Sequence, residues 1–437
     1  MSLLERLEAS VREQAGRAAL SAGDERVTYA ELLGAIERRA RELAGREPVG
    51  LDGSRPIAFV TDFFAARAQA RTALAHPPSA PAALREIREA SVGEAARGRD
   101  AGTVFYSSGS VGAAKAVPLS DEGLEAAAVA FGPWGEVRPG DRLAVGLAPA
   151  QIFGFVRGAL NALLFGAEAV FFKPLRDPLA EAERLGAGSV LLPSALVALA
   201  ARHAGRVRLS ALRCGGGPVA EADAAAVESA RGVAVRTGYG LTESCGLGSR
   251  QPGDRPRRPG SSGPPAPGLE VAIVREDGAR APAGEIGEIR LRGSAVFGGY
   301  LSPGDPDPFD AEGRLLTGDA GFLDEAGELC VRGRLAFALR AGGRILCAEE
   351  VEAAIVEHPG VAEAAAAPWE RSFGVLVVVR DGSEALLEQI RAHARRRLPA
   401  FARPRRLLPV ASIPRTAAGK VDRRAAAEWL SRTSSRA

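Results

Sequence analysis

Lysine is scarce in this chain, and two of its lysines lie where a positive charge could do chemistry. Only Lys115, Lys173 and Lys420 are lysines, so 53 of the 56 basic residues are arginines. Lysine delivers a compact ammonium on a slim stem, whereas arginine presents a broad planar fork. Lys115 and Lys420 each lie in a short glycine-containing motif, which indicates two tight polar sites that take one point charge. Lys173, in FFKPLRD, is interpreted as a lysine retained by chance.

The first motif, YSSGSVGAAKAVPLS at residues 106–120, has the residue types of a phosphate-binding loop. Its glycines let backbone N–H groups approach an anion, its serines add hydroxyl donors, and its lysine supplies charge. The spacing GxxGxxK differs from the GxxxxGK(S/T) of a Walker A loop. A plain glycine-rich turn is the alternative. The predicted phosphate ligands are Ser107, Ser108, Gly109, Ser110, Gly112 and Lys115.

A second pair of segments, CGGGPV (214–219) and RTGYGLTES (236–244), could hold a nucleotide and its metal. Tyr239 lies between glycines and could stack on a purine, and Thr242 could donate to a phosphate. Glu243 offers the carboxylate oxygens that Mg²⁺ prefers. A tight glycine turn with a half-buried tyrosine is the alternative interpretation.

A third group of polar residues follows in the C-terminal half. Asp319, after Thr317 and Gly318, could grip ribose hydroxyls, although an Asx-turn would have the same sequence. Arg334 lies in VRGRL, and Lys420 ends the turn IPRTAAGK.

These motifs are embedded in a chain that alternates strand-like and helical runs. Such alternation between residues 103 and 247 predicts a parallel, doubly wound α/β sheet. Upstream, residues 2–45 predict two helices around a short extended piece, with Thr28 as an N-cap. Residues 56–60 predict a buried strand, followed by a helix through residue 75. The candidate strands of the α/β region are 103–106, 142–148, 168–172, 189–193, 212–216 and 234–240.

The remaining chain predicts a β-rich subdomain and a small C-terminal domain. Residues 250–267 are rich in proline, glycine and arginine and indicate a loop, after which short β segments extend to residue 334. From there, helical and strand-like runs predict a small α+β domain of about a hundred residues that resembles a lid. We therefore expect an N-terminal domain at 1–333, shortened near 75–103, and a C-terminal lid domain at 334–437.

The bulk composition is that of a soluble globular protein. Hydrophobic residues are 46%, charged residues 25% and the net charge is +3, with no long block of one sign, so neither nucleic acid nor a membrane is an expected partner. The four cysteines, without CxxC spacing, and the four scattered histidines disfavour a zinc site or a disulfide framework. The start, MSLLERLEASVREQ, lacks the apolar region of a signal peptide, which predicts a cytoplasmic protein.

In order and spacing, five segments resemble the adenylate-forming superfamily, which includes acyl- and aryl-CoA synthetases, peptide-synthetase adenylation domains and luciferases. GSVGAAK is similar to that family's phosphate loop, T/S-SGTTGxPKG, GYGLTE to its YGxTE motif, and LLTGD to its TGD motif. GEIGEIRLRGSAVFGGYL is similar to its GExxxxGxxxxxGY element, and PRTAAGKVDR to its PxTxxGKxxR end. The resemblance extends over nearly the whole chain, from VTYAELL to GKVDRR.

The resemblance implies an ATP-dependent reaction without a side-chain nucleophile. The substrate carboxylate attacks the α-phosphorus, giving acyl-AMP and pyrophosphate, and a thiol then displaces AMP. By similarity, the serine-rich loop would hold the β- and γ-phosphates, Thr242 and Glu243 would contact phosphate and Mg²⁺, and Lys420 would bridge the carboxylate and the α-phosphate. The other implied ATP contacts are Gly216, Gly217, Pro218, Gly238, Tyr239 and Gly240 around adenine, and Asp319 and Arg334 at the ribose.

The resemblance also implies a lid that rotates between the two half-reactions. Lys420 would then leave the site, and a loop at Gly342 and Gly343 would line a pantetheine tunnel. The chain departs from the family pattern at Val111 and Ala114 of the phosphate loop, and at Phe337, the hinge position that is usually Asp or Lys.

The acid pocket is expected beside LAPAQIFGFV and the GLTESCG segment. Gln151 replaces a histidine that is frequent in acyl-CoA synthetases, and its neutral amide argues against an α-amino acid, whose amine pairs with an aspartate there. Phe153 and Gly154 suggest a flat, compact acid such as an aryl carboxylate, although ordinary core packing could equally explain Phe153. The expected pocket residues are Gln151, Phe153, Gly154, Cys245 and Gly246.

Taken together, these features predict an acid–thiol ligase that uses ATP, Mg²⁺ and coenzyme A to convert a small carboxylic acid into its thioester. One alternative is a stand-alone adenylation enzyme that loads the phosphopantetheine of an acyl carrier protein. The other is a non-catalytic nucleotide-binding homologue, an interpretation motivated by Val111 and Phe337.

Overall fold

The described residues divide into two compact units. The computed structural model describes residues 2–43, 48–78, 80, 102–107, 115–130, 137–302, 304–341, 344–379, 383–415 and 421–432. The first unit comprises residues 1–271, 291–316 and 327–329, and the second comprises 272–290, 317–326 and 330–437. The expected boundary between the N-terminal and lid domains, after residue 333, stays a prediction.

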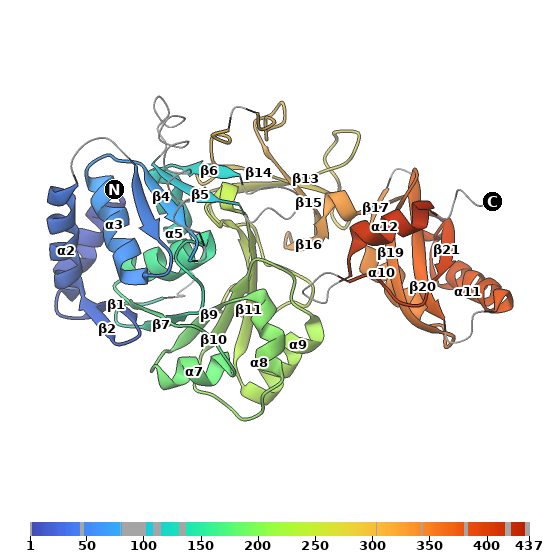
Figure 1. Ribbon diagram of the computed structural model, residues 1–437, viewed down its shortest axis with the longest axis horizontal. Coiled ribbons are helices and arrows are strands. Elements are labelled where there is room, and N and C mark those ends of the chain that lie inside the picture. The colour runs from blue at the N-terminus through green and yellow to red at the C-terminus, as the bar shows by residue number, and fades with distance from the viewer. Residues whose placement is uncertain are drawn as a thin grey trace. The chain divides into compact units, whose positions relative to one another are not determined.

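The centre of the first unit is an eight-stranded sheet (Figure 1). Its strand order is β12-β11-β10-β9-β7-β8-β1-β2; the six inner strands are parallel and the two edge strands antiparallel. This sheet confirms the predicted parallel α/β architecture. The strands are β1 (Ala18–Ala22), β2 (Glu25–Thr28), β7 (Arg142–Val145), β8 (Glu168–Phe171), β9 (Ser189–Pro193), β10 (Ala211–Gly215), β11 (Ala234–Gly240) and β12 (Gly248–Arg250).

Three short helices, α7 (Pro178–Arg184), α8 (Val197–Ala201) and α9 (Glu221–Ala226), lie along one side of β9, β10 and β11 (Figure 1). Strands covered on both faces have near-continuous apolar sequences, which made these strands predictable. The residues that join strands and helices in this core are Ala144, Leu179, Val190, Val197, Leu212, Ala224, Val227 and Val235.

A smaller sheet has the order β3-β4-β5-β6, in which β3, β4 and β5 are parallel and β6 is antiparallel. The predicted strand at 103–106 is confirmed as β5, but it belongs to this sheet and not to the large one. The strands are β3 (Val49–Asp52), β4 (Ala73–His76), β5 (Thr103–Tyr106) and β6 (Ala116–Leu119).

The predicted strand at residues 56–60 is wrong, because this segment begins the helix α3 (Pro56–Ala68). Pro56 occupies the first turn, where its missing N–H costs nothing. The helix is apolar nearly all round, so its sequence lacks the 3.6-residue period that distinguishes a helix from a buried strand. The predicted helix through residue 75 is also too long, because β4 starts at Ala73.

An aromatic cluster fixes the π-helix η2 (Phe153–Leu160), which carries two of the predicted pocket residues. Phe155 packs edge-on against Phe59 and Phe63 of α3, with ring centroids 5.4 and 4.7 Å apart, and lies 5.7 Å from Phe105 of β5. Such pairs contribute about 0.5–1.5 kcal/mol each beyond their buried area. The start of η2 is therefore held by a rigid core. Helices α5 (Asp121–Val129) and α6 (Asn161–Leu164) complete this region.

Both N-terminal helices begin with a capping box, and one of the two caps was predicted. Helix α1 (Leu3–Gln14) has a capping box between Ser2 and Glu5. Helix α2 (Tyr29–Glu42) has one between Thr28 and Glu31, which confirms Thr28 as its N-cap. Each cap satisfies backbone donors that would otherwise be unpaired, worth about 1 kcal/mol.

A four-stranded sheet of order β13-β14-β15-β16 follows, and each of its strands falls on a predicted β segment. The strands are β13 (Leu269–Val274), β14 (Gly287–Gly293), β15 (Leu315–Leu323) and β16 (Leu329–Arg334).

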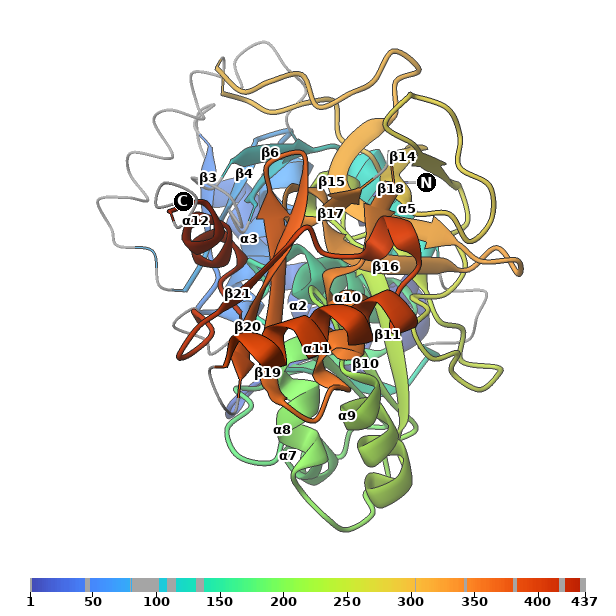
Figure 2. The ribbon, with the colours of Figure 1, turned by 90° about the vertical axis from the view of Figure 1, so that its right-hand side faces the viewer.

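The C-terminal part of the second unit is a three-stranded sheet with helices on both faces (Figure 2). Its order is β19-β20-β21, with β17 and β18 forming a separate antiparallel pair. The elements are β17 (Leu339–Ala341), β18 (Arg344–Leu346), α10 (Ala348–Val356), β19 (Val361–Trp369), β20 (Ser372–Val379), α11 (Glu384–Arg397), β21 (Arg406–Pro409) and α12 (Arg423–Arg432).

Alternation along β19 and β20 assigns the helices to the two faces. Ala366, Val375 and Val377 pack with α10 and α11, whereas their neighbours Ala365 and Leu376 pack with α12. This two-residue period is that of a strand covered on both sides. Within the described residues, no helix is long and apolar enough to cross a bilayer.

Candidate active site

The two ends of the predicted phosphate loop are fastened together in the first unit. Ser107 follows β5 and Lys115 precedes β6, and these strands pair antiparallel. The Ser107 N–H donates to the Lys115 carbonyl at 3.0 Å, and the Lys115 N–H donates to Ser107 Oγ at 3.1 Å. The first and last residues of the loop are therefore hydrogen-bonded neighbours. The intervening ligands predicted from the sequence, Ser108, Gly109, Ser110 and Gly112, lie outside the described residues, as do Val111 and Ala114.

The Lys115 side chain points at two residues from a distant segment. Its Nζ lies 4.2 Å from the ring centre of Tyr300 and 3.9 Å from Asp305 Oδ1. An ammonium over an aromatic face is attracted by the negative potential of the ring. About a third of the Lys115 side chain stays exposed (35%), so the charge is available to a ligand.

Tyr300 also links this lysine to Glu243. The Tyr300 hydroxyl donates to Glu243 Oε1 at 2.9 Å, and the Phe297 N–H donates to the Glu243 carbonyl at 2.8 Å. Lys115 and Glu243, predicted for phosphate and Mg²⁺, therefore both contact one tyrosine, Lys115 over its ring and Glu243 at its hydroxyl. The sequence interpretation did not select Tyr300 or Asp305. Tyr300 could have been found as the last residue of the GExxxxGxxxxxGY element, whereas Asp305 carries no sequence signal.

The geometry of Glu243 suits a divalent cation. Within the described part of the chain, its second carboxylate oxygen, Oε2, accepts no hydrogen bond, and the side chain is half-buried. The described residues contain no group of three or more His, Cys, Asp or Glu side chains that could hold a metal alone. Mg²⁺ commonly takes one or two carboxylates and completes its shell with phosphate oxygens and water. Glu243 fits that role.

Thr242 and Glu243 lie on the tight turn η5 (Thr242–Ser244), directly after β11. Ser244 Oγ accepts from the Leu241 N–H at 3.2 Å and donates to the Leu247 carbonyl at 2.5 Å, which locks the turn. Cys245, next in the chain, has φ of +53°, a left-handed conformation that costs a non-glycine residue about 1–3 kcal/mol. Such strain persists only where the surrounding structure fixes it, as it does beside this turn.

The expected adenine-binding residues lie on two adjacent parallel strands. Cys214 of β10 pairs with Thr237 of β11, so the glycines after β10 and Tyr239 lie near the same sheet edge. A Cβ on Gly240 would lie 2.3 Å from the Gly246 carbonyl oxygen, so only glycine permits this backbone approach. Tyr239 is half-buried, and three residues of the glycine segment are exposed and accessible to a ligand: Gly216, Gly217 and Pro218. Gly238 lies against the Ser249 carbonyl of β12.

The expected pocket residues come together only in part. A Cβ on Gly215 would lie 3.1 Å from the Phe153 ring, so this ring packs against the end of β10. Gln151 is exposed at the start of the same segment. Gly154 is buried against the Ala148 carbonyl and Leu147, so it is not exposed to a ligand as Gln151 is. Gly246 lies close to Ile152, the residue that directly precedes Phe153.

Cys245 has the character of a packing residue. Burial raises the pKa of its thiol far above the ordinary value, and its Sγ lies 3.2 Å from where a Cβ on Gly123 would be. A neutral, buried thiol is a poor nucleophile. The four free cysteines, all buried, are Cys214, Cys245, Cys330 and Cys347.

The expected ribose ligands form a hydrogen-bonded cluster in the second unit. Arg334 Nε lies 3.2 Å from Asp319 Oδ1, and Arg334 Nη1 donates to the Thr317 carbonyl at 3.2 Å. The Asp319 N–H donates to Thr317 Oγ1 at 3.0 Å, so this turn is closed by the threonine hydroxyl and not by the Asp319 side chain, as the alternative Asx-turn would require. Lys420, Gly342 and Gly343 lie outside the described residues, and so does the Phe337 side chain.

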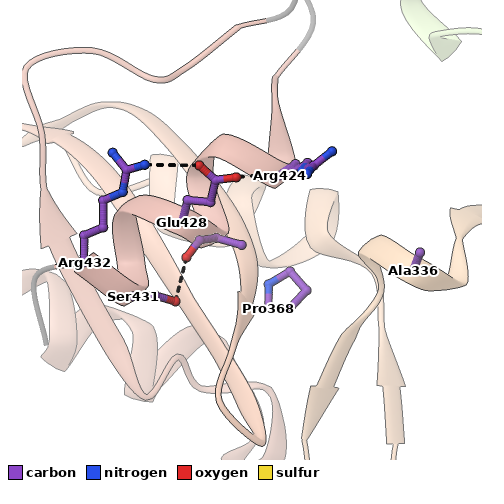
Figure 3. Close-up of a pocket in the computed structure, with 7 residues that line it drawn as sticks. Ala336, Pro368, Arg424, Glu428, Ser431 and Arg432 are labelled. Atoms are coloured by element: carbon purple, nitrogen blue, oxygen red, sulfur yellow. Dashed lines mark hydrogen bonds and ion pairs between the residues drawn. The ribbon is translucent and has the colours of Figure 1, made fainter. Parts of the chain in front are cut away.

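One surface pocket in the second unit is distinct from these residues (Figure 3). It has a volume of about 500 Å³ and lies between α12 and Pro368. Glu428 pairs with Arg424 and Arg432 at 3.8 and 3.6 Å across its wall. None of the residues selected from the sequence lines it.

The sequence and fold have known relatives. Residues 60–301, more than half of the chain, match the AMP-binding enzyme family, and residues 350–420 match the AMP-binding enzyme C-terminal domain. The probable CoA ligase CCL5 of Humulus lupulus is 31% identical over 346 residues, 74% of this chain and 63% of that protein. The 2-succinylbenzoate–CoA ligase of Enterococcus faecalis is 34% identical over 213 residues, 47% of this chain and 43% of that protein.

The chain thus spans less than two thirds of the length of these curated relatives. Among solved structures, ATP-bound MatB from Rhodopseudomonas palustris superimposes with a TM-score of 0.79 over 98% of this chain and 99% of that chain. At 22% identity this likeness establishes a common fold.

Proposed function

The chain belongs to the AMP-binding enzyme family, and on this premise we propose that it is an ATP-dependent acid–thiol ligase. It activates a carboxylic acid to acyl-AMP with release of pyrophosphate and then transfers the acyl group to the thiol of coenzyme A. The observation that carries the proposal is the convergence of Lys115 and Glu243 on Tyr300, because the two residues come from separate motifs that both point to a triphosphate and its Mg²⁺.

In the first half-reaction, an oxygen of the substrate carboxylate attacks the α-phosphorus in line, and the bond to the bridging oxygen of pyrophosphate breaks. Lys115 balances charge on the β- and γ-phosphates, and Thr242 donates to a phosphate oxygen. Glu243 would hold Mg²⁺, which neutralises phosphate charge when bound. Lys420 bridges the attacking carboxylate and the α-phosphate, where charge develops.

In the second half-reaction the thiol attacks the acyl carbon, and AMP leaves. No cysteine of the chain is proposed to carry the acyl group, because burial raises the pKa of Cys214 to about 12 and that of Cys245 still further. The proposed acceptor thiol enters beside Gly342 and Gly343 after the lid has rotated. ATP, Mg²⁺ and coenzyme A are thus the proposed co-substrates and cofactor, and the cytoplasm the proposed location.

For the acid we propose a compact, flat carboxylate such as an aryl acid. The Phe153 ring packs against Gly215 at the end of β10, and such a ring could stack on a flat acid.

The proposal is tested by incubating the purified protein with ATP, Mg²⁺ and a panel of carboxylic acids, with and without coenzyme A. We expect AMP and pyrophosphate only with an accepted acid, and a thioester only when coenzyme A is also present. If a thioester formed with a carrier protein but not with coenzyme A, the carrier protein would be the acceptor. ADP as the product, or no nucleotide turnover with any acid, would contradict the proposed ligase.

A further inference from the structure

Asp305 occupies an unusual place beside the predicted phosphate loop. It follows a turn in which its N–H donates to the Ser302 carbonyl at 3.1 Å, and its side chain is only 19% exposed. One oxygen, Oδ1, lies 3.9 Å from Lys115 Nζ. The other, Oδ2, is buried and has no hydrogen-bond partner within the described residues. In the part of the chain that the structure describes, this mostly buried carboxylate thus has one cationic partner, Lys115.

The Asp305 carboxylate attracts the Lys115 ammonium without forming a direct hydrogen bond to it. The 3.9 Å separation is longer than a hydrogen bond, and the second contact is with the face of the Tyr300 ring. An ammonium has three donors, and neither contact uses one in a direct hydrogen bond. Lys115 is therefore positioned by charge while its donors stay available to a stronger anion.

We propose that Asp305 is a positioning residue. It holds the Lys115 ammonium until a triphosphate or pyrophosphate replaces Asp305 as the partner of that ammonium. The inference rests on the proposed function, because it requires Lys115 to meet ATP. A polyphosphate carries more charge than one carboxylate and competes successfully for the ammonium, but its binding then costs the attraction between Lys115 and Asp305. Asp305 accordingly lowers the affinity for ATP and for the pyrophosphate product, and so favours release of pyrophosphate.

Glu243 contacts Tyr300 and Asp305 lies beside Lys115, but the proposed effects of these two carboxylates on ATP binding differ. Glu243 accepts a hydrogen bond from the Tyr300 hydroxyl through one oxygen, and its other oxygen could bind a cation, whereas Asp305 faces the Lys115 ammonium. One carboxylate therefore assists Mg·ATP binding, and the other opposes it through Lys115.

The test is calorimetric titration of ATP with Mg²⁺, and of pyrophosphate, into the wild-type protein, Asp305→Asn, Lys115→Met and the double variant. We expect Asp305→Asn to bind both ligands about 10-fold more tightly. In the Lys115→Met background the same change should improve affinity by less than about 3-fold, because there is no ammonium to compete for. Asp307→Asn is the matched control. Asp307 is exposed and accepts a hydrogen bond from the Phe309 N–H at 3.0 Å, and within the described residues it forms no ion pair with Lys115.

Weaker binding by Asp305→Asn would overturn the inference, as would an equal gain with and without Lys115, which would mean simple repulsion. A loss confined to titrations with Mg²⁺ would instead make Asp305 a metal ligand and overturn it as well. Asp305→Ser repeats the comparison if the asparagine variant fails to fold. If the wild type binds no ATP, or Lys115→Met leaves its affinity unchanged, the proposed function fails. If only Asp305→Asn lacks an effect, the inference alone fails.

Discussion

Lys115 in the first unit and Arg423 in the second are both paired with carboxylates, but the two pairs differ in how tightly they are made. Arg423 Nη1 contacts Glu352 at 2.5 Å, Nη2 contacts Glu349 at 2.6 Å, and Nη1 also donates to the Ala366 carbonyl at 2.8 Å. Burial alone would lower the pKa of the Arg423 guanidinium, yet the Glu352 and Glu349 contacts raise it. Among the described residues, Lys115 has one ion pair, at 3.9 Å.

This difference separates an anchor from a binding group. Arg423 begins α12, directly after the segment that carries Lys420, and ties that helix to α10 and β19. A planar fork with matched carboxylates suits a permanent tie. Lys115 is instead held loosely enough that a ligand can take its ammonium. The chain thus has lysine at the position proposed to bind phosphate and arginine at the anchor.

The largest expected effect comes from breaking the anchor. Arg423→Ala leaves Glu352, whose side chain is 14% exposed, without its cation, and should lower the free energy of unfolding of the second unit by about 3 kcal/mol. Urea unfolding followed by the fluorescence of Trp369 and Trp429, both in this unit, measures the change. The control is Arg424→Ala, since that side chain is 85% exposed and should cost less than about 0.5 kcal/mol. Equal losses from both variants would refute the anchor.

A smaller effect is expected at the loosely held cluster. Tyr300→Phe keeps the ring under Lys115 but removes the hydroxyl that donates to Glu243, and a hydrogen bond to a charged group contributes about 1.5–3 kcal/mol. We expect the Mg²⁺ concentration for half-maximal ATP binding to rise roughly 10-fold. Tyr300→Leu, which also removes the ring, should weaken ATP binding at saturating Mg²⁺ too. An unchanged Mg²⁺ dependence in Tyr300→Phe would show that Glu243 does not meet the metal.

The smallest expected effect is a loss of stability at low pH. It tests whether the first unit also contains a tightly paired carboxylate, Glu168, whose role is structural. Burial of Glu168 in the first unit opposes its ionisation, but Ser21, Arg142 and Arg26 outweigh it and lower its pKa below 4.5. Its stabilising contribution is therefore fully present above the unfolded pKa and is lost as the pH falls through the folded one.

Urea unfolding between pH 3 and 7 should show this loss, at about 1.4 kcal/mol for each unit by which the pKa is lowered. Glu168→Gln is less stable at pH 7 but should lose less stability on acidification. If both proteins lose the same amount, Glu168 is not the titrating group.

The parallel core could be predicted because both of its faces are buried, so that segments such as 189–193 are continuously apolar. The helix α3 was missed for the same reason, since a helix buried on nearly all sides is continuously apolar too. Within the site, Lys115 and Glu243 could be identified because short motifs carry their chemistry. Asp305 could not, because its role arises from a contact with Lys115, 190 positions away, and no local pattern encodes that distance.

The central claim is that acid activation proceeds through acyl-AMP with Lys420 at the reacting atoms. Acid-dependent exchange of labelled pyrophosphate into ATP, measured with the best acid of the panel, tests it most directly, because exchange requires reversible formation of acyl-AMP and needs no thiol. We predict exchange by the wild type and a loss of roughly 100- to 1,000-fold in Lys420→Ala. Undiminished exchange in that variant, or wild-type exchange that is independent of the acid, would contradict the account.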